Sequence, residues 1–558
     1  MKQYLFTLLL FSFFNTYSQD NLLNQIIHNP LSKNAPPTDY ESDHWYYLDY
    51  EKDTILGISL ERAYAELLKN KESRPVVIAV LDTDFDMSHT DMQGQFWTNS
   101  DEIPDNGIDD DENGYIDDIH GWNFLGTPDH RNGLKFIRME ETRIVAKYAQ
   151  QFKNKDSSQI KAKDRIVYQT YCKAKASYDS VAASLTRKIK KSADYIKEKS
   201  EVTKRLHSHI ADTVLTIEKL DAIQTKDSLV LKDIKFAKKY LKKGEDDQKL
   251  LDYLEFKKKS LEICMNLIED SRKQVGDDQQ NIKDIGYGSN TLGENVDDLS
   301  HGTKVAGILS ALRNNGKGID GISNAIKIMP LYFSAVGDYT DKDLALAIRY
   351  AVDNGAHIIN ISHAKDFSMQ ETWVDEALLY ANEKNVLVVA SAGNENINLD
   401  QEKSFDDHYP DDINEQGEEF IPNLIKVGAI NPQANDIKWE SSNYGKSFVD
   451  LFAPGMFIKV LYPNDKTNYG GGTSCAAPMV AGVAGLIKSY YPNLSAMEIK
   501  NIILDSGISY TIDVEVEQED GSKKTIPFSE LSKSGKVVNA YNAILMAEEV
   551  AKAKGKTK

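Results

Sequence analysis

The chain has 558 residues, which exceeds a single domain of ordinary size and leaves room for a large α/β core with an inserted module. Hydrophobic residues make up 41% and charged residues 27%, a balance typical of a soluble protein with a sizeable core. The formal net charge of −19 is spread along the chain and argues against nucleic acid or anionic lipid as the main partner, because both would repel the protein.

The N-terminus has the features of an export signal. An apolar run at 4–14 follows a lysine, and Thr16 and Ser18 are the small residues that a cleavage site requires. The run is too short to span a bilayer, and no other long apolar stretch occurs. We predict a signal peptide over 1–18 and a mature chain that starts near Gln19, has no transmembrane segment, and is periplasmic, cell-surface or extracellular. A membrane anchor is the alternative.

The next segments predict an α/β core. Residues 19–44 contain Asn-Pro and Pro-Pro pairs and predict an extended lead-in, followed by a short amphipathic helix within 58–70. The run Val76–Leu81 is apolar on both faces, as a central parallel strand requires. Similar runs recur at 326–331, 357–361, 386–390 and 425–429, with helical stretches at 341–354 and 369–385. Strands that alternate with helices predict an open, mostly parallel sheet covered on both faces. Parts of this core are expected at 45–129 and 286–545, and a polar tail at 546–558.

Residues 130–285 interrupt that pattern with a long polar segment that lacks proline. Apolar residues recur there at helical spacing among charged ones. They are Val167, Tyr171, Ala174, Tyr178, Val181, Leu185 and Ile189, and later Leu251, Leu254, Leu261, Met265 and Ile268. A narrow apolar stripe on long charged helices predicts an inserted helical hairpin or coiled coil. The pattern leaves open whether this insertion binds a protein partner or is only a solvated excursion.

The chain has three cysteines, Cys172, Cys264 and Cys475. An odd and sparse set in an exported protein does not form a disulfide framework. Cys172 and Cys264 could pair across two helices, or both could be free buried thiols.

An acidic loop before the insertion has the spacing of a calcium site. Asp109, Asp111 and Asn113 alternate and precede a glycine, like the start of a D-x-D-x-[DN]-G loop. The twelfth position is His120 instead of glutamate, so the loop is not a complete EF-hand. We predict a structural Ca²⁺ here, with an acidic solvated turn as the alternative. The candidate ligands are Asp109, Asp111, Asn113, Tyr115, Asp117 and Asp118.

Three further motifs carry residues suited to acyl transfer. Ser474 lies in the Gly-rich stretch GGGTSCAAP at 470–478, directly before an apolar helical run, where backbone N–H groups favour developing negative charge. His301 begins the stretch HGTKVAGI. Asp82 directly follows the strand Val76–Leu81, where catalytic groups of open α/β sheets lie, and an acid there can hold an imidazole in one tautomer.

The order of these motifs, with DTxxDxxH at 82–89, resembles the subtilisin-like serine proteases, the subtilases. The resemblance covers about 45–128 and 285–545 and implies a three-layer α/β/α sandwich. It implies that Ser474 is the nucleophile, His301 the general base and Asp82 the residue that orients His301. It also implies an oxyanion hole formed by the Asn394 side chain and the Ser474 backbone N–H.

The resemblance further implies a site for extended polypeptide and no organic cofactor. The implied substrate-binding residues are Ser362, His363, Ala364, Ser391, Ala392 and Gly393. Acidic loops like 105–118 occur in subtilases, which supports the calcium prediction.

The sequence departs from the family pattern at four positions. Asp84 replaces a usual glycine, His363 and Ala364 replace the usual residues after the substrate strand, and Lys304 replaces a frequent histidine. A carboxylate of Asp84 near His301 would raise the histidine pKa. Alternatively, Asp84 points outward or pairs with Lys304.

The main hypothesis is therefore an exported serine endopeptidase. The second is an impaired subtilase scaffold that presents the helical insertion to a protein partner. A structural coiled-coil envelope protein is a third, but it leaves the three motifs unexplained.

Overall fold

The computed structural model describes residues 26–32, 37–128, 132–210, 214–297, 299–401, 410–414, 417–518 and 521–556. The predicted signal peptide lies outside these residues. The chain divides into two compact units. The sheet unit comprises residues up to Lys135, Lys273–Ala335 and from Tyr339 onward, and the helical unit comprises Phe136–Arg272 and Val336–Asp338. No described helix combines the length and the apolar character needed to cross a membrane.

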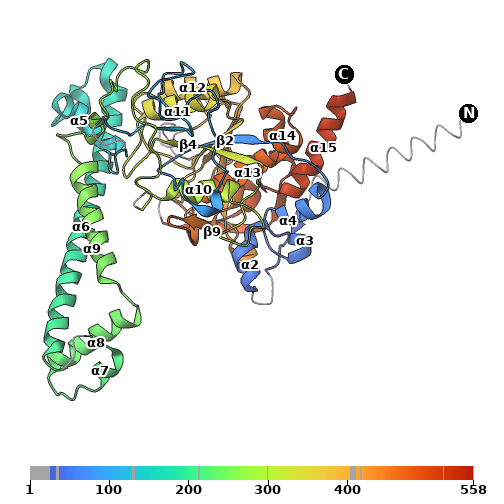
Figure 1. The fold of residues 1–558 in the computed structure, drawn as a ribbon. Helices are drawn as coiled ribbons and strands as arrows, with labels where there is room; N and C mark the ends of the chain where they lie inside the picture. The colour runs from blue at the N-terminus through green and yellow to red at the C-terminus, as the bar shows by residue number, and fades with distance from the viewer. Residues whose placement is uncertain are drawn as a thin grey trace, which may run out of the picture. The chain divides into compact units, whose positions relative to one another are not determined.

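The sheet unit is built on one large twisted sheet (Figure 1). Its strands run in the order β1-β11-β14-β8-β7-β6-β5-β2-β4-β3, and every pair is parallel except β11 with β14. In chain order they are β1 (Ile26–His28), β2 (Val76–Asp82), β3 (Trp122–Asn123), β4 (Ile326–Tyr332), β5 (Ile358–Ile361), β6 (Leu387–Ser391), β7 (Leu424–Ile430), β8 (Leu451–Pro454), β11 (Ile508–Thr511) and β14 (Lys536–Val537). The hairpins β9 (Met456–Tyr462) with β10 (Lys466–Gly471) and β12 (Asp513–Glu517) with β13 (Lys523–Pro527) are separate.

Helices cover both faces of this sheet. They are α2 (Asp39–His44), α3 (Tyr50–Asp53), α4 (Leu60–Ala63), α10 (His301–Ser310), α11 (Asp341–Asp353), α12 (Glu371–Glu383), α13 (Thr473–Tyr490), α14 (Ala496–Ser506) and α15 (Ala540–Lys556). Side chains of β2 alternate between two cores. Ile78 and Val80 belong to the core that includes residues of α10, α13 and α14, whereas Ala79 and Leu81 belong to the core that includes residues of α11 and α12. Burial on both faces explains why the strand sequence is continuously apolar, and it confirms the predicted three-layer α/β/α fold.

All five predicted strands form, with ends within one residue of those expected. The polar tail predicted at 546–558 is wrong as far as Lys556, because α15 continues to that residue and buries Ala543, Ile544 and Ala547 against the sheet unit. The predicted extended lead-in is also wrong in part. Residues 39–44 form α2, whose N-cap Thr38 makes a capping box with Glu41.

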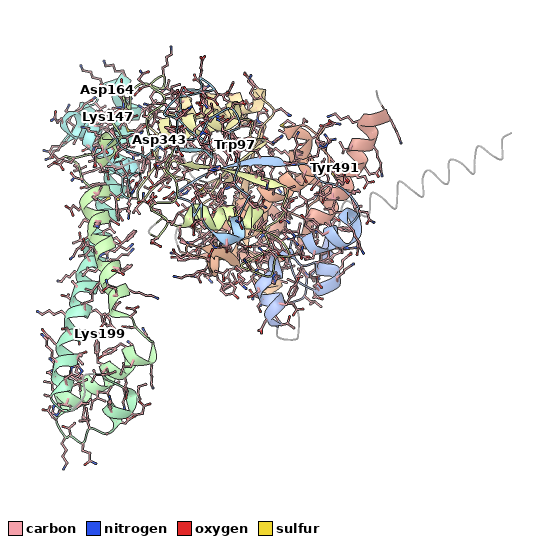
Figure 2. All side chains as sticks on the ribbon, viewed as in Figure 1. Trp97, Lys147, Asp164, Lys199, Asp343 and Tyr491 are labelled. Carbon is pink, nitrogen blue, oxygen red and sulfur yellow. The ribbon has the colours of Figure 1, made fainter. Side chains whose placement is uncertain are left out.

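The helical unit contains α5 (Glu140–Phe152), α6 (Arg165–His207), α7 (Ile217–Asp221), α8 (Ser228–Lys242) and α9 (Asp247–Lys259). The predicted long helix is present, since α6 runs for 43 residues and packs with α5, α8 and α9. Lys199 of α6, labelled in Figure 2, is buried, and its ammonium is stabilised there because it lies over the Tyr240 ring and pairs with Asp247 at 2.5 Å. The unit has a small core of its own, formed by Val202, Leu206, Leu220, Val230, Ile234, Ala237 and Tyr240.

All three cysteines are free, so Cys172 and Cys264 do not form the disulfide that the sequence left open. Cys172 is exposed and Cys264 is buried. The two ends of the helical unit meet, since Met139 N–H donates to Cys264 C=O at 3.1 Å and Ser271 Oγ donates to Phe136 C=O at 2.9 Å.

Candidate active site

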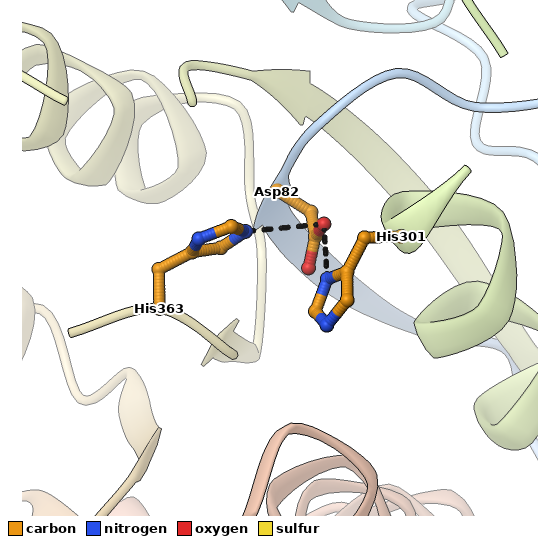
Figure 3. A group of neighbouring side chains, drawn as sticks. All are labelled: Asp82, His301 and His363. Atoms are coloured by element: carbon orange, nitrogen blue, oxygen red, sulfur yellow. Dashed lines mark hydrogen bonds and ion pairs between the residues drawn. The ribbon is translucent and has the colours of Figure 1, made fainter. Parts of the chain in front are cut away.

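Asp82 is the last residue of β2, the strand at which the order of strand addition reverses. The chain places β4 on one side of β2 and then β5 on the other, and open α/β sheets bind ligands beyond the carboxyl ends of strands at such a point. Asp82 is fully buried, and its Oδ1 lies 2.7 Å from His301 Nδ1 (Figure 3). Burial raises the pKa of Asp82, but the nearby His301 and His363 lower it by more than burial raises it. The net pKa therefore lies well below the ordinary value. The carboxylate therefore stays ionised beside the imidazole.

His301 is placed by the first turn of α10. Thr83 fixes that turn, because its hydroxyl accepts from Gly302 N–H at 3.1 Å and donates to Leu299 C=O at 3.1 Å. The glycine is required by close packing. A Cβ on Gly302 would lie 2.8 Å from the carbonyl oxygens of Thr83 and Asp84. These contacts explain why a glycine follows the histidine, and they hold α10 directly over the end of β2.

Ser474 lies in the first turn of α13, where unpaired backbone N–H groups point outward. The helix is preceded by Gly472 at φ 118, a conformation that strains any other residue. Ser474 is only half-buried, so its hydroxyl is accessible from solvent. Among the described residues no hydrogen bond joins Ser474 Oγ to His301, as is frequent in enzymes without substrate.

Asn394 is locked next to this helix start. Its Oδ1 accepts from both the backbone N–H and the hydroxyl of Thr473, each at 2.9 Å. With the carbonyl end of the amide occupied in this way, the Nδ2 end is left to donate. Gly393 N–H in turn donates to the Thr473 hydroxyl at 3.2 Å. The arrangement therefore provides an amide donor beside the Ser474 backbone N–H, as an oxyanion hole requires.

The predicted substrate-binding residues follow the ends of two adjacent strands. Ser362 comes directly after β5, and its hydroxyl donates to Ser474 C=O at 3.1 Å. His363 and the exposed Ala364 continue from there. Ser391 ends β6, and Ala392 and Gly393 lead from it to Asn394. The carboxyl ends of β2, β5 and β6 thus surround the same region as the start of α13.

The contact between His363 and Asp82 was not foreseen from the sequence. His363 Nε2 lies 3.2 Å from Asp82 Oδ1, and its ring centroid lies 5.1 Å from that of His301 (Figure 3). The signal that could have revealed the contact is the register of neighbouring strands. Ile361 pairs with Leu81, so residues just after Ile361 lie beside Asp82.

Asp84 is buried, which excludes the alternative that it points outward. Its Oδ1 accepts from Phe85 N–H at 2.9 Å and Gly293 N–H at 2.7 Å, and its Oδ2 accepts from Asn295 N–H at 2.6 Å. Burial raises the pKa of Asp84, and these backbone donors oppose the shift. Asp84 thus fastens the loop around 293–295, and Lys304 instead lies over the Tyr462 ring at 5.3 Å. An effect of Asp84 on the pKa of His301 stays a prediction.

The acidic loop brings carboxylates together. Oxygen atoms of Glu102, Asp109 and Asp111 lie within 4.8 Å of one another, the largest separation possible for two oxygens bound to one Ca²⁺ at about 2.4 Å. The residues therefore fit a hard cation, although the sequence did not identify Glu102. Asp117 accepts from two backbone N–H groups instead.

The other predicted calcium ligands are engaged within the loop. Asp118 accepts from Asn99, Asn113 and Tyr350, and Asn113 Oδ1 accepts from Tyr115 N–H at 2.8 Å. Burial raises the pKa of Asp118. The structure thus centres the group of close carboxylates on Glu102, Asp109 and Asp111, and a calcium role for the remaining predicted ligands stays a prediction.

Comparison with known proteins gives a consistent result. A profile of the Subtilase family matches residues 73–528. The chain is 34% identical over 247 residues to a cell wall-associated protease of Bacillus subtilis, which covers 44% of this chain and 25% of that protein. It is 30% identical over 223 residues to subtilisin DY of Bacillus licheniformis, covering 39% of this chain and 75% of that protein.

A thermophilic serine proteinase of a Bacillus strain is 35% identical over 215 residues, which cover 38% of this chain and 47% of that protein. The chain thus spans from about a quarter to three quarters of the length of these relatives.

Proposed function

The chain belongs to the subtilase family, and on this premise we propose that it is an exported serine endopeptidase that hydrolyses polypeptides through an acyl-enzyme. The observation that carries the proposal is the 2.7 Å contact between buried Asp82 and His301 at the switch point of the sheet. It is supported by Ser474 at the start of α13 and by the fixed amide of Asn394 beside it.

The proposed reaction uses each of these groups at a stated atom. His301 Nε2 takes the proton of Ser474 Oγ while that oxygen bonds to the carbonyl carbon of the scissile peptide. Asn394 Nδ2 and the Ser474 backbone N–H bind the resulting oxyanion. His301 then gives the proton to the leaving amine, the C–N bond breaks, and water hydrolyses the ester by the same steps. Asp82 orients the imidazole and stabilises its cation.

We assign substrate binding to the residues after β5 and β6, namely Ser362–Ala364 and Ser391–Gly393. An extended polypeptide fits this site through main-chain hydrogen bonds, as in strand addition. No organic cofactor is needed for this chemistry. Glu102, Asp109 and Asp111 would hold Ca²⁺, which supplies stability to the loop and takes no part in the reaction.

Export through the predicted signal peptide is part of the proposal. The mature protein should then begin near Gln19 and be periplasmic, cell-surface or extracellular. N-terminal sequencing of the protein recovered from outside the cytoplasm tests this, and an intact Met1 in that fraction would contradict it.

We further propose that the helical unit is a separate module and the place where a protein partner would bind. Its own core and the meeting of its two ends support its being a separate module. Replacing 136–272 by a short flexible linker should leave hydrolysis of small peptides within about tenfold of the intact chain. A folded but inactive product would show instead that the unit supports the catalytic groups.

The central experiment is labelling with a fluorophosphonate, which reacts only with an activated serine. Wild type should be labelled on Ser474, whereas Ser474→Ala and His301→Ala should lose both labelling and peptide hydrolysis. The two losses should be similar in size and should not add in the double variant, because triad residues act as a unit. Replacement of the exposed Ser447 by alanine is the matched control. Hydrolysis by Ser474→Ala within tenfold of wild type would refute the proposal.

A further inference from the structure

Asp82 has two histidines beside it, and the proposed reaction uses only one. His301 Nδ1 lies 2.7 Å and His363 Nε2 lies 3.2 Å from the same oxygen, Asp82 Oδ1. That oxygen also accepts from Thr83 N–H at 2.7 Å, while the buried Asp82 Oδ2 has no hydrogen-bond partner among the described residues. His363 Nε2 is also buried and without an aligned hydrogen-bond partner in that part of the chain. Two unsatisfied ligand atoms therefore face the same small region as His301.

The three side chains have the chemistry and the spacing of a transition-metal site. One ligand atom from each of Asp82, His301 and His363 lies within 4.8 Å of the others. In a tetrahedral zinc site with bonds of about 2.0–2.1 Å, ligand atoms lie roughly 3.3 Å apart. The separation of 3.2 Å between His363 and Asp82 already matches this value, and the His301 pair needs to open by about half an ångström.

The outer contacts and the exposure suit the same ion. His363 Nδ1 lies 3.4 Å from Ser334 Oγ, which can accept the N–H of that nitrogen and so turn Nε2 toward the metal. The side chains of His301 and His363 are 32% and 20% exposed, which leaves a route from solvent and a position for water as fourth ligand. Two imidazoles and one carboxylate favour Zn²⁺ over Ca²⁺ or Mg²⁺, which prefer oxygen ligands.

We propose that Asp82, His301 and His363 form an inhibitory zinc site within the catalytic centre. Zinc binds neutral imidazole, so it takes the place of the proton that His301 Nδ1 shares with Asp82. A neutral imidazole whose Nδ1 is bound to metal carries its proton on Nε2. His301 then has no lone pair at the atom that must accept the proton of Ser474. Zinc therefore blocks the base without touching the nucleophile.

The inhibition rests on the proposed protease function, whereas the binding does not, so the two are measured separately. Binding is followed by calorimetry with ZnCl₂ on Ser474→Ala, in excess CaCl₂ to occupy the acidic loop, and by the visible spectrum of Co²⁺. His363→Leu removes one of three ligands and should lower the affinity for zinc by more than about 100-fold, which exceeds the effect typical of outer-sphere partners. The exposed His209 provides the matched control, and His209→Gln should bind as the parent.

Inhibition is measured on chains that retain Ser474. Micromolar Zn²⁺ should inhibit peptide hydrolysis, a chelator should restore it, and His363→Leu should be resistant relative to its own uninhibited rate.

Several results would overturn the site. Equal zinc affinity in the parent and in both His363→Leu and the milder His363→Gln would do so. So would zinc binding that disappears with the exposed Cys172→Ser variant but survives loss of His363. If the binding pattern holds but the wild type hydrolyses nothing, the zinc site stands and the protease proposal fails.

Discussion

Asn394 allows catalysis and stability to be separated with two substitutions at one position. Replacing it by alanine removes the Nδ2 donor from the oxyanion site and also the Oδ1 acceptor used by Thr473. Loss of one such donor lowers kcat by about 10²–10³, or about 2.7–4 kcal/mol, a range established on subtilisin, a member of the same family. Because Thr473 is fully buried, its N–H and hydroxyl lose their acceptor, and the free energy of unfolding should fall by about 1–3 kcal/mol.

Asn394→Asp retains an acceptor oxygen for Thr473 but replaces the donor nitrogen. We expect it to lose at least as much kcat as the alanine variant, because its charge opposes the oxyanion, while KM and the unfolding free energy stay close to wild type. Steady-state kinetics on a peptide substrate give kcat and KM, and urea denaturation gives the free energy of unfolding. A kcat within tenfold of wild type in either variant would refute the oxyanion role of Asn394, and equal destabilisation of Asn394→Asp and Asn394→Ala would refute the role of its Oδ1.

Three further outcomes follow from the structure. Calcium at 100 times its Kd should stabilise the folded protein by about 2.7 kcal/mol and so raise Tm, and the double variant Asp109→Ala, Asp111→Ala should abolish the rise. An equal Tm of the wild type in chelator and in calcium would argue against the site. Burial and the charge of Asp450 raise the pKa of Asp412 above its ordinary value of 3.8. The contribution of Asp412 to the free energy of unfolding is therefore fully present below pH 3.8 and is lost as pH rises through the folded pKa. Hence Tm of Asp412→Asn relative to wild type should increase from pH 4 to pH 8, and a constant difference would contradict the assignment. Burial raises the pKa of Cys475 to about 12, so iodoacetamide at pH 8 should modify the exposed Cys172 without loss of activity; inactivation that tracks modification of Cys475 would contradict this.

The central sheet could be predicted because its strands are buried on both faces and therefore read as continuous apolar runs. Strands at the edges could not, since β1 and β3 have only three and two residues and depend on their partners for hydrogen bonds. Helix α15 was missed for a related reason. Most of its apolar residues lie before Glu548, and the lysines that follow gave its end the composition of a tail.

Local motifs identified the candidate catalytic residues, because each lies on a short stretch with a demanding backbone. What the motifs could not show is how different stretches meet. The contact of His363 with Asp82 depends on strand register, and the place of Glu102 beside Asp109 and Asp111 depends on the path of the loop. The coupling of Asp84 to the loop around 293–295 likewise joins residues more than 200 positions apart.

The meeting of the two ends of the helical unit has a consequence for how quickly the catalytic groups can assemble. Asp82 and His301 are 219 positions apart, and closing so long a loop delays a contact in a folding chain. If α5–α9 fold first, their joined ends shorten the loop to roughly 80 residues, and the entropy cost of closure falls by about 0.9 kcal/mol. Local helical contacts form fast, so this order is also the one that kinetics favours. A long insertion between two catalytic residues then slows their encounter far less than its length suggests.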